Sequence, residues 1–169
     1  ESGDLEKGFA EAYLIVEGNW ATGFHEQLYL ETQGMAAFMR EDGAVEVIGS
    51  LQCPFYVQGA IQKVMALPPG KVIIRQAATG GGFGGKEDYP SILGSYAALL
   101  AYRSRHPVKI VFDREEDLRV TPKRHPSKSR YRMGVSREGK ITALDADIIL
   151  DSGAYTTLSR VVLQRSQLH

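Results

Sequence analysis

The stretch Thr79-Gly80-Gly81-Gly82-Phe83-Gly84-Gly85-Lys86-Glu87 decides how the rest of the chain is organised. Five of the six positions from 80 to 85 are glycine, and so many glycines are too costly to order inside a helix or a strand. Glycine is kept where the backbone passes close to another group or adopts a positive φ. The stretch is therefore predicted to be a loop that permits close approach.

Regular elements are predicted on both sides of this glycine loop. The apolar run Lys71–Arg75 indicates a strand before it, and the Ala- and Leu-rich segment Tyr89–Arg105 indicates a helix after it. A loop between a strand and a helix N-terminus leaves backbone amides pointing outward, beside the positive end of the helix dipole. Such a loop suits an anionic or oxygen-rich ligand.

The composition is that of a soluble globular protein. The chain has 169 residues with 20 Lys+Arg and 20 Asp+Glu, so its balanced charge gives no reason to expect nucleic acid or an anionic membrane as a partner. No apolar run approaches the roughly 20 residues that span a bilayer. Cys53 is the single cysteine, which excludes an internal disulfide and favours a reducing, cytoplasmic location.

We expect residues 1–169 to be a single domain excised from a longer protein. The chain opens on Glu1 rather than on a start methionine, and the helical pattern that begins near Leu158 shows no stop signal before His169. Predicted strands and helices follow one another without strict alternation. The expected fold class is therefore α+β, with a mixed sheet and packed helices.

Local signals place the other elements. Asp4 is predicted to cap a short helix, Asp42-Gly43 to close a hairpin, and Pro54 to open a helix. Extended segments are expected at 12–20, 28–32, 45–48, 107–113, 131–135 and 141–150.

Generic motifs overlap the glycine loop. Gly80, Gly82 and Gly85 satisfy GxGxxG between a strand and a helix, and Asp113 ends the next apolar strand, as the ribose-binding acid of an NAD- or FAD-binding domain does. The GxxxxGK pattern also fits, but Glu87 stands where a phosphate-binding loop needs Ser or Thr. A third interpretation is a glycine turn that only lets the helix pack closely on the sheet.

Further segments decide between these interpretations. In chain order they are LYLET at 28–32, SLQ at 50–52, GGGFGGKE at 80–87, HPV at 106–108, DREED at 113–117, RHP at 124–126 and GKITAL at 139–144. From about Gly23 to Arg165, this series closely resembles the molybdenum-binding large subunit of the xanthine dehydrogenase and aldehyde oxidase family. The dinucleotide-binding domain becomes the alternative, and a non-catalytic interaction domain with the same fold is a third option.

The resemblance implies a molybdenum-dependent oxidoreductase. It would hydroxylate an N-heterocycle, such as a xanthine-like purine, or an aldehyde, with oxygen taken from water. The implied cofactor is molybdenum bound to molybdopterin, either in its simple form or as the cytosine dinucleotide. Iron–sulfur clusters and FAD, on partner domains or subunits, would carry the electrons away.

The resemblance also implies roles for individual residues in binding the cofactor. Gln52 matches the glutamine whose amide faces an oxo ligand of the metal, and a neutral amide can donate there without adding net charge. Gly82, Phe83 and Gly84 match the loop backbone that approaches the cofactor. Gln52 and Phe83 would thus lie near the molybdenum without ligating it.

Two further residues are expected to bind the substrate. Glu87 matches a carboxylate that orients the heterocycle, and Arg165 falls near an arginine that stabilises negative charge developing on the ring. Together they favour an N-heterocycle over an aldehyde.

No catalytic residue is assigned within 1–169, because the family's base, a glutamate, lies further towards the C-terminus. The remaining C-terminal part of the same subunit is therefore an expected partner. The isolated chain is expected to be inactive and to bind cofactor poorly.

Overall fold

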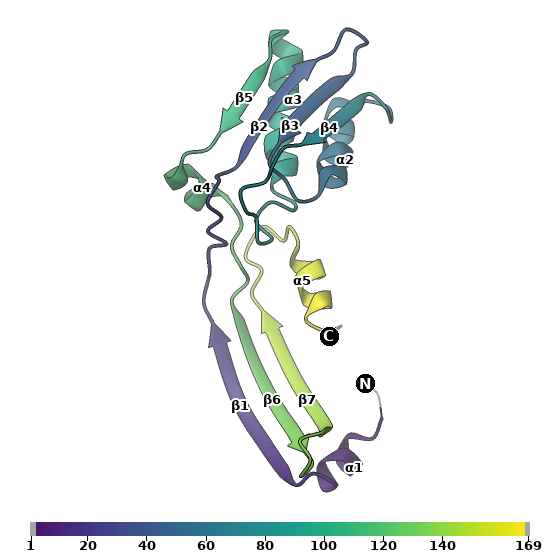
Figure 1. Cartoon of the computed structure of the whole chain (residues 1–169), viewed down its shortest axis with the longest axis vertical. Coiled ribbons are helices and arrows are strands. Elements are labelled where there is room, and N and C mark those ends of the chain that lie inside the picture. Colours follow the sequence, from purple (N-terminus) through teal and green to yellow (C-terminus); the bar gives the residue numbers. More distant parts are fainter. Residues whose placement is uncertain (1–2, 168–169) are drawn as a thin grey trace. The chain divides into compact units, whose positions relative to one another are not determined.

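The computed structural model describes residues 3–167, and its contacts divide the chain into two compact units (Figure 1). The glycine-loop unit is Glu26–Arg124, and the sheet unit combines Glu1–His25 with His125–His169. Two compact units can form one domain or two domains. The single domain predicted for residues 1–169 therefore stays a prediction.

The glycine-loop unit is a four-stranded sheet covered by two helices. The strand order is β4-β3-β2-β5; β2 is antiparallel to both of its neighbours, whereas β3 and β4 are parallel. Helix α2 connects β3 to β4 and helix α3 follows β4, and both are drawn behind the strands in Figure 1. The bounds are β2 Gly34–Met39, β3 Val45–Gly49, α2 Pro54–Met65, β4 Val72–Gln76, α3 Pro90–Ser104, β5 Val108–Val111 and α4 Arg114–Val120.

The core of this unit lies between the helices and the sheet. A Cβ atom built on Gly94 of α3 would lie 2.9 Å from Cγ1 of Val57 in α2, so the glycine lets the two helices pack closely. The buried side chains of the core are Met35, Ala37, Val45, Val47, Leu51, Val57, Ile61, Val72, Leu93, Ala97, Ala98, Ala101 and Phe112. This core supports the C-terminal ends of β3 and β4. The segment that contains Gln52 follows β3, and the glycine loop follows β4.

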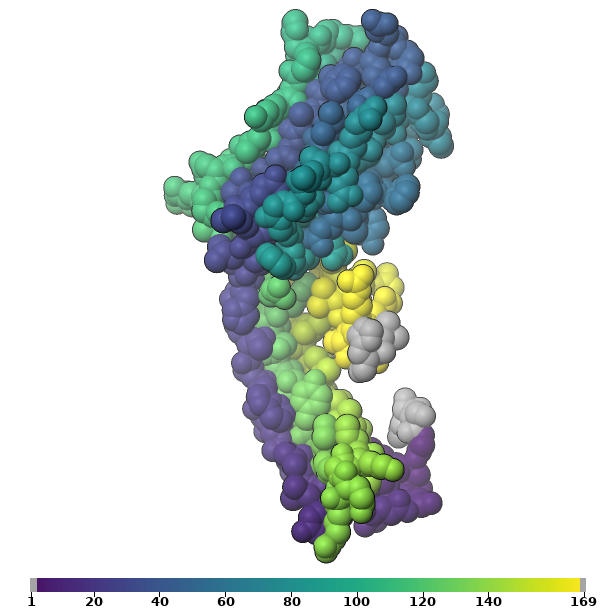
Figure 2. Space-filling view, in the orientation of Figure 1, coloured from purple at the N-terminus to yellow at the C-terminus, as the bar shows by residue number. Residues whose placement is uncertain are grey.

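The sheet unit is built on three antiparallel strands in the order β1-β6-β7. Their bounds are β1 Leu14–Thr22, β6 Ser127–Val135 and β7 Ile141–Leu150, and α1 (Leu5–Ala10) and α5 (Ser159–Arg165) complete the unit. The strands lie side by side in the space-filling view, β1 in purple and the β6–β7 hairpin in green (Figure 2). A Cβ on Gly8 would lie 2.4 Å from the Thr142 carbonyl oxygen, so α1 sits directly on β7.

Most of the local predictions are confirmed. Asp4 caps α1 by accepting from Lys7 N at 3.0 Å, Gly43 has φ +78° in the β2–β3 hairpin, and Pro54 opens α2. The α+β class with a mixed sheet is confirmed as well. Among residues 3–167, the structure contains no helix with the length and apolar composition needed to cross a bilayer.

The predicted strand at 28–32 is wrong. This segment is irregular and Leu28 has φ +48°, because Tyr29 and Glu31 turn towards the glycine loop instead of entering a sheet. Strand β6 also starts at Ser127 rather than at Tyr131, since the residues from 127 pair with Thr22 and its neighbours in β1.

Candidate functional site

The glycine loop adopts a backbone that few side chains tolerate. Gly81 and Gly84 have φ +96° and +94°, and Phe83 between them has φ +52°. A left-handed φ is uncommon for an aromatic residue and marks a constrained loop. Phe83 is also 66% exposed in this chain.

The three glycines of the GxGxxG spacing, Gly80, Gly82 and Gly85, serve close packing instead. Cβ atoms built on them would lie 2.5, 2.3 and 2.5 Å from other side chains, which is closer than real Cβ atoms come. The atoms that they would meet are Glu31 Cβ, Gln52 Oε1 and Tyr29 Cε1, in that order. The spacing that resembles a dinucleotide fingerprint is therefore explained by contacts within the chain.

Gln52 is held by the loop through its carboxamide oxygen. Oε1 accepts from Gly84 N at 3.1 Å and from Lys86 N at 3.2 Å, and Gln52 N donates to Lys86 O at 2.7 Å. Two backbone donors on one side-chain atom identify that atom as the oxygen of the amide. The Nε2 group, which only donates, is thereby turned away from the loop amides on an exposed side chain.

Lys86 is buried beneath the loop, with 0% of its surface exposed. Its Nζ donates to Glu31 Oε2 at 2.9 Å and to Ser50 Oγ at 2.9 Å, and lies 4.8 Å from the centre of the Tyr29 ring. A buried ammonium is stable only when it is paired and hydrogen-bonded, as this one is. It cannot reach a nucleotide phosphate from this position, which removes the phosphate-loop interpretation.

Glu31 completes this ion pair. Burial alone would raise its pKa, but hydrogen bonds from Ser50, the Gly80 amide and Lys86, together with the charge of Lys86, lower it to about 2. The carboxylate is therefore ionised throughout the neutral range and fixes the ammonium of Lys86.

We expect Glu31 to make the stability of the protein sensitive to acid. Its folded pKa lies below the unfolded value of 4.5, so its stabilisation is complete above that value and is lost as the pH falls towards 2. The melting temperature of the unmodified protein should exceed that of Glu31→Gln by more at about pH 5 than at about pH 3. An equal difference at both pH values would contradict this assignment.

A second buried network anchors the C-terminal side of the loop. The Tyr29 hydroxyl donates to Asp117 Oδ1 at 2.7 Å, Gln33 N donates to Asp117 Oδ2 at 2.6 Å, and Gln33 Nε2 donates to Gly85 O at 2.8 Å. Burial, then the hydrogen bond to Asp117, raises the pKa of Tyr29, so its hydroxyl remains a donor at neutral pH. These buried hydrogen bonds thus hold the C-terminal side of the loop in place.

The sequence did not predict that polar side chains would support the loop from beneath. Tyr29, Glu31 and Asp117 lie within the segments that carry the family resemblance, and Lys86 was considered only as a phosphate ligand. Tyr29 and Asp117 are 88 residues apart and Glu31 and Lys86 are 55 apart, so their contacts leave no local pattern in the sequence. The one available clue was a lysine placed directly after a glycine loop and followed by an acid that a phosphate would not tolerate.

These residues fit an oxygen-rich group such as the molybdenum–pterin cofactor. A Cβ built on Gly84 would meet only Glu87 Oε1, at 4.0 Å, so there is open space above the loop backbone. Gln52 Nε2 supplies a neutral donor at the edge of this space, and no side chain from the five glycines obstructs it. A neutral donor beside a bare backbone is suited to metal-bound oxygen atoms.

The structure brings most of the predicted site residues together. Gln52 packs against Gly82 and accepts from Gly84 N, Phe83 lies between these two glycines in the chain, and half-buried Glu87 follows the loop. Arg165 is in the last turn of α5 in the sheet unit, so its predicted part in this site stays a prediction.

The dinucleotide alternative is not favoured. A dinucleotide-binding domain needs a parallel sheet, whereas β2 here is antiparallel to both neighbours, and β4 and β5 form opposite edges of the sheet. Asp113 caps α4 by accepting from Glu116 N at 2.7 Å. Its carboxylate is therefore the N-cap of α4.

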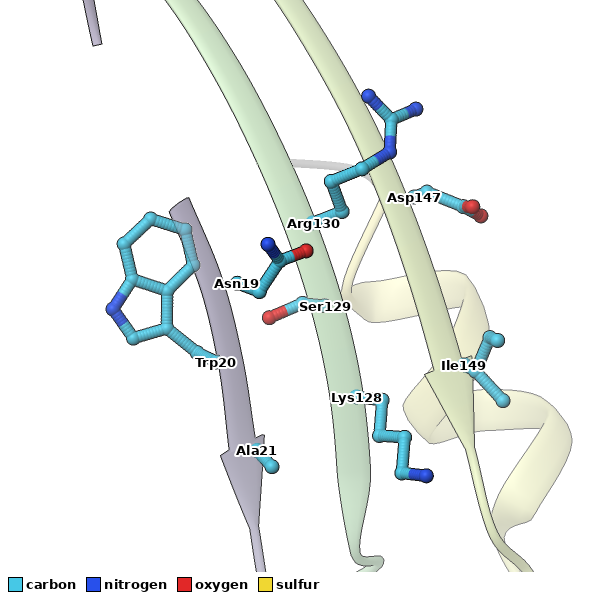
Figure 3. Close-up of a pocket in the computed structure, with 8 residues that line it drawn as sticks. All are labelled: Asn19, Trp20, Ala21, Lys128, Ser129, Arg130, Asp147 and Ile149. Atoms are coloured by element: carbon cyan, nitrogen blue, oxygen red, sulfur yellow. The ribbon is translucent and has the colours of Figure 1, made fainter. Parts of the chain in front are cut away.

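A separate pocket of about 360 Å³ lies on the sheet unit (Figure 3). Trp20 stands at one side of it, packed edge-on against Tyr131 with ring centres 5.6 Å apart. The lining residues are Asn19, Trp20, Ala21, Lys128, Ser129, Arg130, Asp147 and Ile149, from β1, β6 and β7. None of these eight is a predicted site residue.

Comparison with known proteins identifies the class of protein that this fold and loop define. Residues 1–169 match the family described as the molybdopterin cofactor-binding domain, and the chain belongs to that family. The predicted resemblance to the molybdenum-binding subunit of xanthine dehydrogenases and aldehyde oxidases is thereby confirmed.

Individual relatives agree with this assignment. The chain is 36% identical to xanthine dehydrogenase/oxidase of Mus musculus and 34% identical to the nicotinate dehydrogenase large molybdopterin subunit of Eubacterium barkeri, over 100% of its own length in each case. It spans 13% of the mouse protein and 39% of the bacterial subunit. Aldehyde oxidoreductase from Desulfovibrio gigas has the same fold, with a TM-score of 0.82 at 21% identity over 96% of this chain and 18% of that one.

Proposed function

We propose that this chain forms part of the cofactor socket of a molybdenum hydroxylase that oxidises an N-heterocycle or an aldehyde with oxygen from water. The observation that carries the proposal is the carboxamide of Gln52, whose oxygen is held by the Gly84 and Lys86 amides. Its donor end is left for the cofactor. Molybdenum on its pterin would supply, when bound, the redox chemistry that inserts the oxygen and accepts the electrons.

The chain's own residues would bind and orient. Gln52 Nε2 would donate to an oxygen of the metal centre, and Gly82 would serve that site by leaving room for the Gln52 carboxamide. The bare backbone of Gly84 would allow the metal centre to approach. The exposed Phe83 ring would cover the site and keep water from it. A donor fixed in advance stabilises developing charge without reorganisation, which is the main way such groups accelerate reactions.

Glu87 would position the substrate, and Arg165 would stabilise negative charge on the ring. Relatives named for xanthine and nicotinate act on N-heterocycles, which favours that class of substrate over aldehydes. A carboxyl group that hydrogen-bonds a ring N–H discriminates strongly against substrates lacking that group.

The wider assembly belongs to the same proposal. Iron–sulfur and FAD domains or subunits would carry electrons onward, and the C-terminal remainder of the subunit would supply the base glutamate and most of the pterin contacts. We also propose a single domain for residues 1–169, a cytoplasmic location, and either the simple or the cytosine dinucleotide form of the cofactor. Residues 1–169 expressed alone would show no activity and far less than one molybdenum per chain.

The test is to assay the full-length complex on purines, aldehydes and nicotinate side by side. We expect turnover of at least one N-heterocycle, with one molybdenum per large subunit by metal analysis. Absence of both molybdenum and turnover in the full-length complex would refute the proposal, and turnover of aldehydes alone would refute the substrate class.

Replacement of Glu87 by glutamine tests its part in substrate choice. For the preferred heterocycle, kcat/KM should fall by about 10- to 100-fold, whereas turnover of an aldehyde, which offers no ring N–H, should change by less than about threefold. The aldehyde serves as the internal control. Equal losses on both substrates would place Glu87 in the support of the loop instead.

A further inference from the structure

The two ends of the glycine loop meet on one carboxylate oxygen. Glu31 Oε2 accepts from Gly80 N at 2.8 Å and from Lys86 Nζ at 2.9 Å, and Glu31 N donates to Gly80 O at 3.1 Å. Four of the five residues between these ends are glycines, whose backbone loses more freedom on ordering than that of other residues. The loop conformation therefore depends on its two end contacts.

Lys86 contacts both Glu31, through its side chain, and Gln52 of the candidate site, through its backbone. Its side chain is wholly buried against Glu31 and Ser50, and its backbone makes two hydrogen bonds with Gln52. A shift of the Lys86 backbone would withdraw one of the two amides that hold Gln52 Oε1. The amide of Gln52 would then be able to turn over, placing its oxygen where its donor should be.

We propose that Lys86 is a positioning residue for Gln52. The ion pair of its buried ammonium with Glu31 closes the glycine loop in the one form in which the Gly84 and Lys86 amides hold the Gln52 oxygen, so that Nε2 faces the cofactor. The part played by Nε2 rests on the proposed function, whereas the closing of the loop stands on the contacts alone. Groups that orient a metal-site residue in this way typically change metal affinity or activity by about 10- to 100-fold when replaced.

Another ion pair in the same unit supplies a matched control. Glu46 is 4% exposed in β3 and is paired with Arg40 at 2.8 Å and with Arg75, but it contacts neither Gln52 nor the glycine loop. Its replacement should lower stability through the loss of a buried carboxylate while leaving the loop in place. The variants Lys86→Met and Glu46→Gln therefore separate positioning from general stability.

The test uses the full-length enzyme and two readouts. Hydrogen exchange followed by mass spectrometry reports on the peptide from Thr79 to Glu87, and steady-state kinetics give kcat and KM per bound molybdenum. In Lys86→Met the loop peptide should exchange at least about tenfold faster, with kcat down by about 10- to 100-fold and KM within about threefold. In Glu46→Gln the loop exchange, kcat and KM should all match those of the unmodified enzyme.

A milder variant is needed if the Lys86→Met protein does not fold and cannot be purified. Glu31→Gln keeps the acceptor for Gly80 and Lys86 but removes the charge, and should give a smaller acceleration of loop exchange with a smaller fall in kcat. Unchanged loop exchange in either variant would overturn the proposal, as would equal acceleration in Glu46→Gln. If the unmodified enzyme contained no molybdenum, the proposed function would fail, while the exchange measurement would still decide the role of Lys86.

Discussion

Glutamate in place of Gln52 is expected to reduce kcat of the full-length enzyme by about 10²- to 10³-fold, the usual loss when one fixed hydrogen-bond donor is removed from a reaction centre. The physical reason is that the two ends of the Gln52 amide would have different functions. Its oxygen accepts from Gly84 N and Lys86 N, and its nitrogen is the donor that we propose for the cofactor. A carboxylate keeps the first function and removes the second.

The replacement should leave the loop intact, because a charged acceptor forms stronger hydrogen bonds with the Gly84 and Lys86 amides than a neutral one does. The melting temperature and the exchange of the loop peptide should consequently remain near those of the unmodified enzyme. Molybdenum content has to be measured together with kcat, so that lost turnover is expressed per bound metal.

Gln52→Ala is the companion variant. It removes both functions, and two backbone donors lose their acceptor, so loop exchange should accelerate and turnover should fall at least as far as in Gln52→Glu. Normal turnover per molybdenum in Gln52→Glu would show that the donor end of the amide is not used. The Gln52 assignment would then be withdrawn, although the loop geometry would stand.

The parts of the fold that sequence predicted are those fixed by local chemistry. Asp4 offers a carboxylate to an amide three residues away, and Asp42-Gly43 supplies the positive φ that the hairpin requires. Pro54 suits the first turn of a helix, and its missing N–H removes no hydrogen bond there. In each case the residues that decide the structure are neighbours in sequence.

The arrangement of the strands was not predictable in this way. β5 follows the glycine loop and α3, yet it pairs with β2 at the far edge of the sheet instead of with β4. Strand pairing depends on which apolar faces cover the core, and that is a property of the whole chain. The mistaken strand at 28–32 has the same origin, since the alternation of Tyr29 and Glu31 reflects two inward contacts with the loop.

The spaced segments in the sequence predicted a candidate site at the glycine loop and Gln52, and the structure shows that these two are in contact. The packing contacts that explain the glycines emerged only from the structure. Lys86 resembled a phosphate ligand in sequence, and it is instead buried by Glu31 and Ser50, which are 55 and 36 residues away. No local pattern can show that a lysine is buried, because its partners decide it.

Alanine at Gly82 is expected to lower kcat by about 10²-fold, since a displacement of about 1 Å in a positioned group can cost that much. The added Cβ would lie 2.3 Å from Gln52 Oε1 and 2.8 Å from Gln52 Cδ, so the carboxamide has to move. Overpacking of this kind also costs about 1–3 kcal/mol of stability. Kinetics per bound molybdenum and thermal unfolding of the full-length enzyme measure the two effects.

The matched control is Gly59→Ala in α2. A Cβ on Gly59 meets nothing within 4 Å, and alanine is favoured over glycine by about 0.5–1 kcal/mol inside a helix, so stability should rise slightly while kcat stays unchanged. Both variants add the same methyl group to the same unit. A loss confined to Gly82→Ala would therefore come from the contact with Gln52, whereas unchanged turnover in Gly82→Ala would mean that the position of this carboxamide does not limit the reaction.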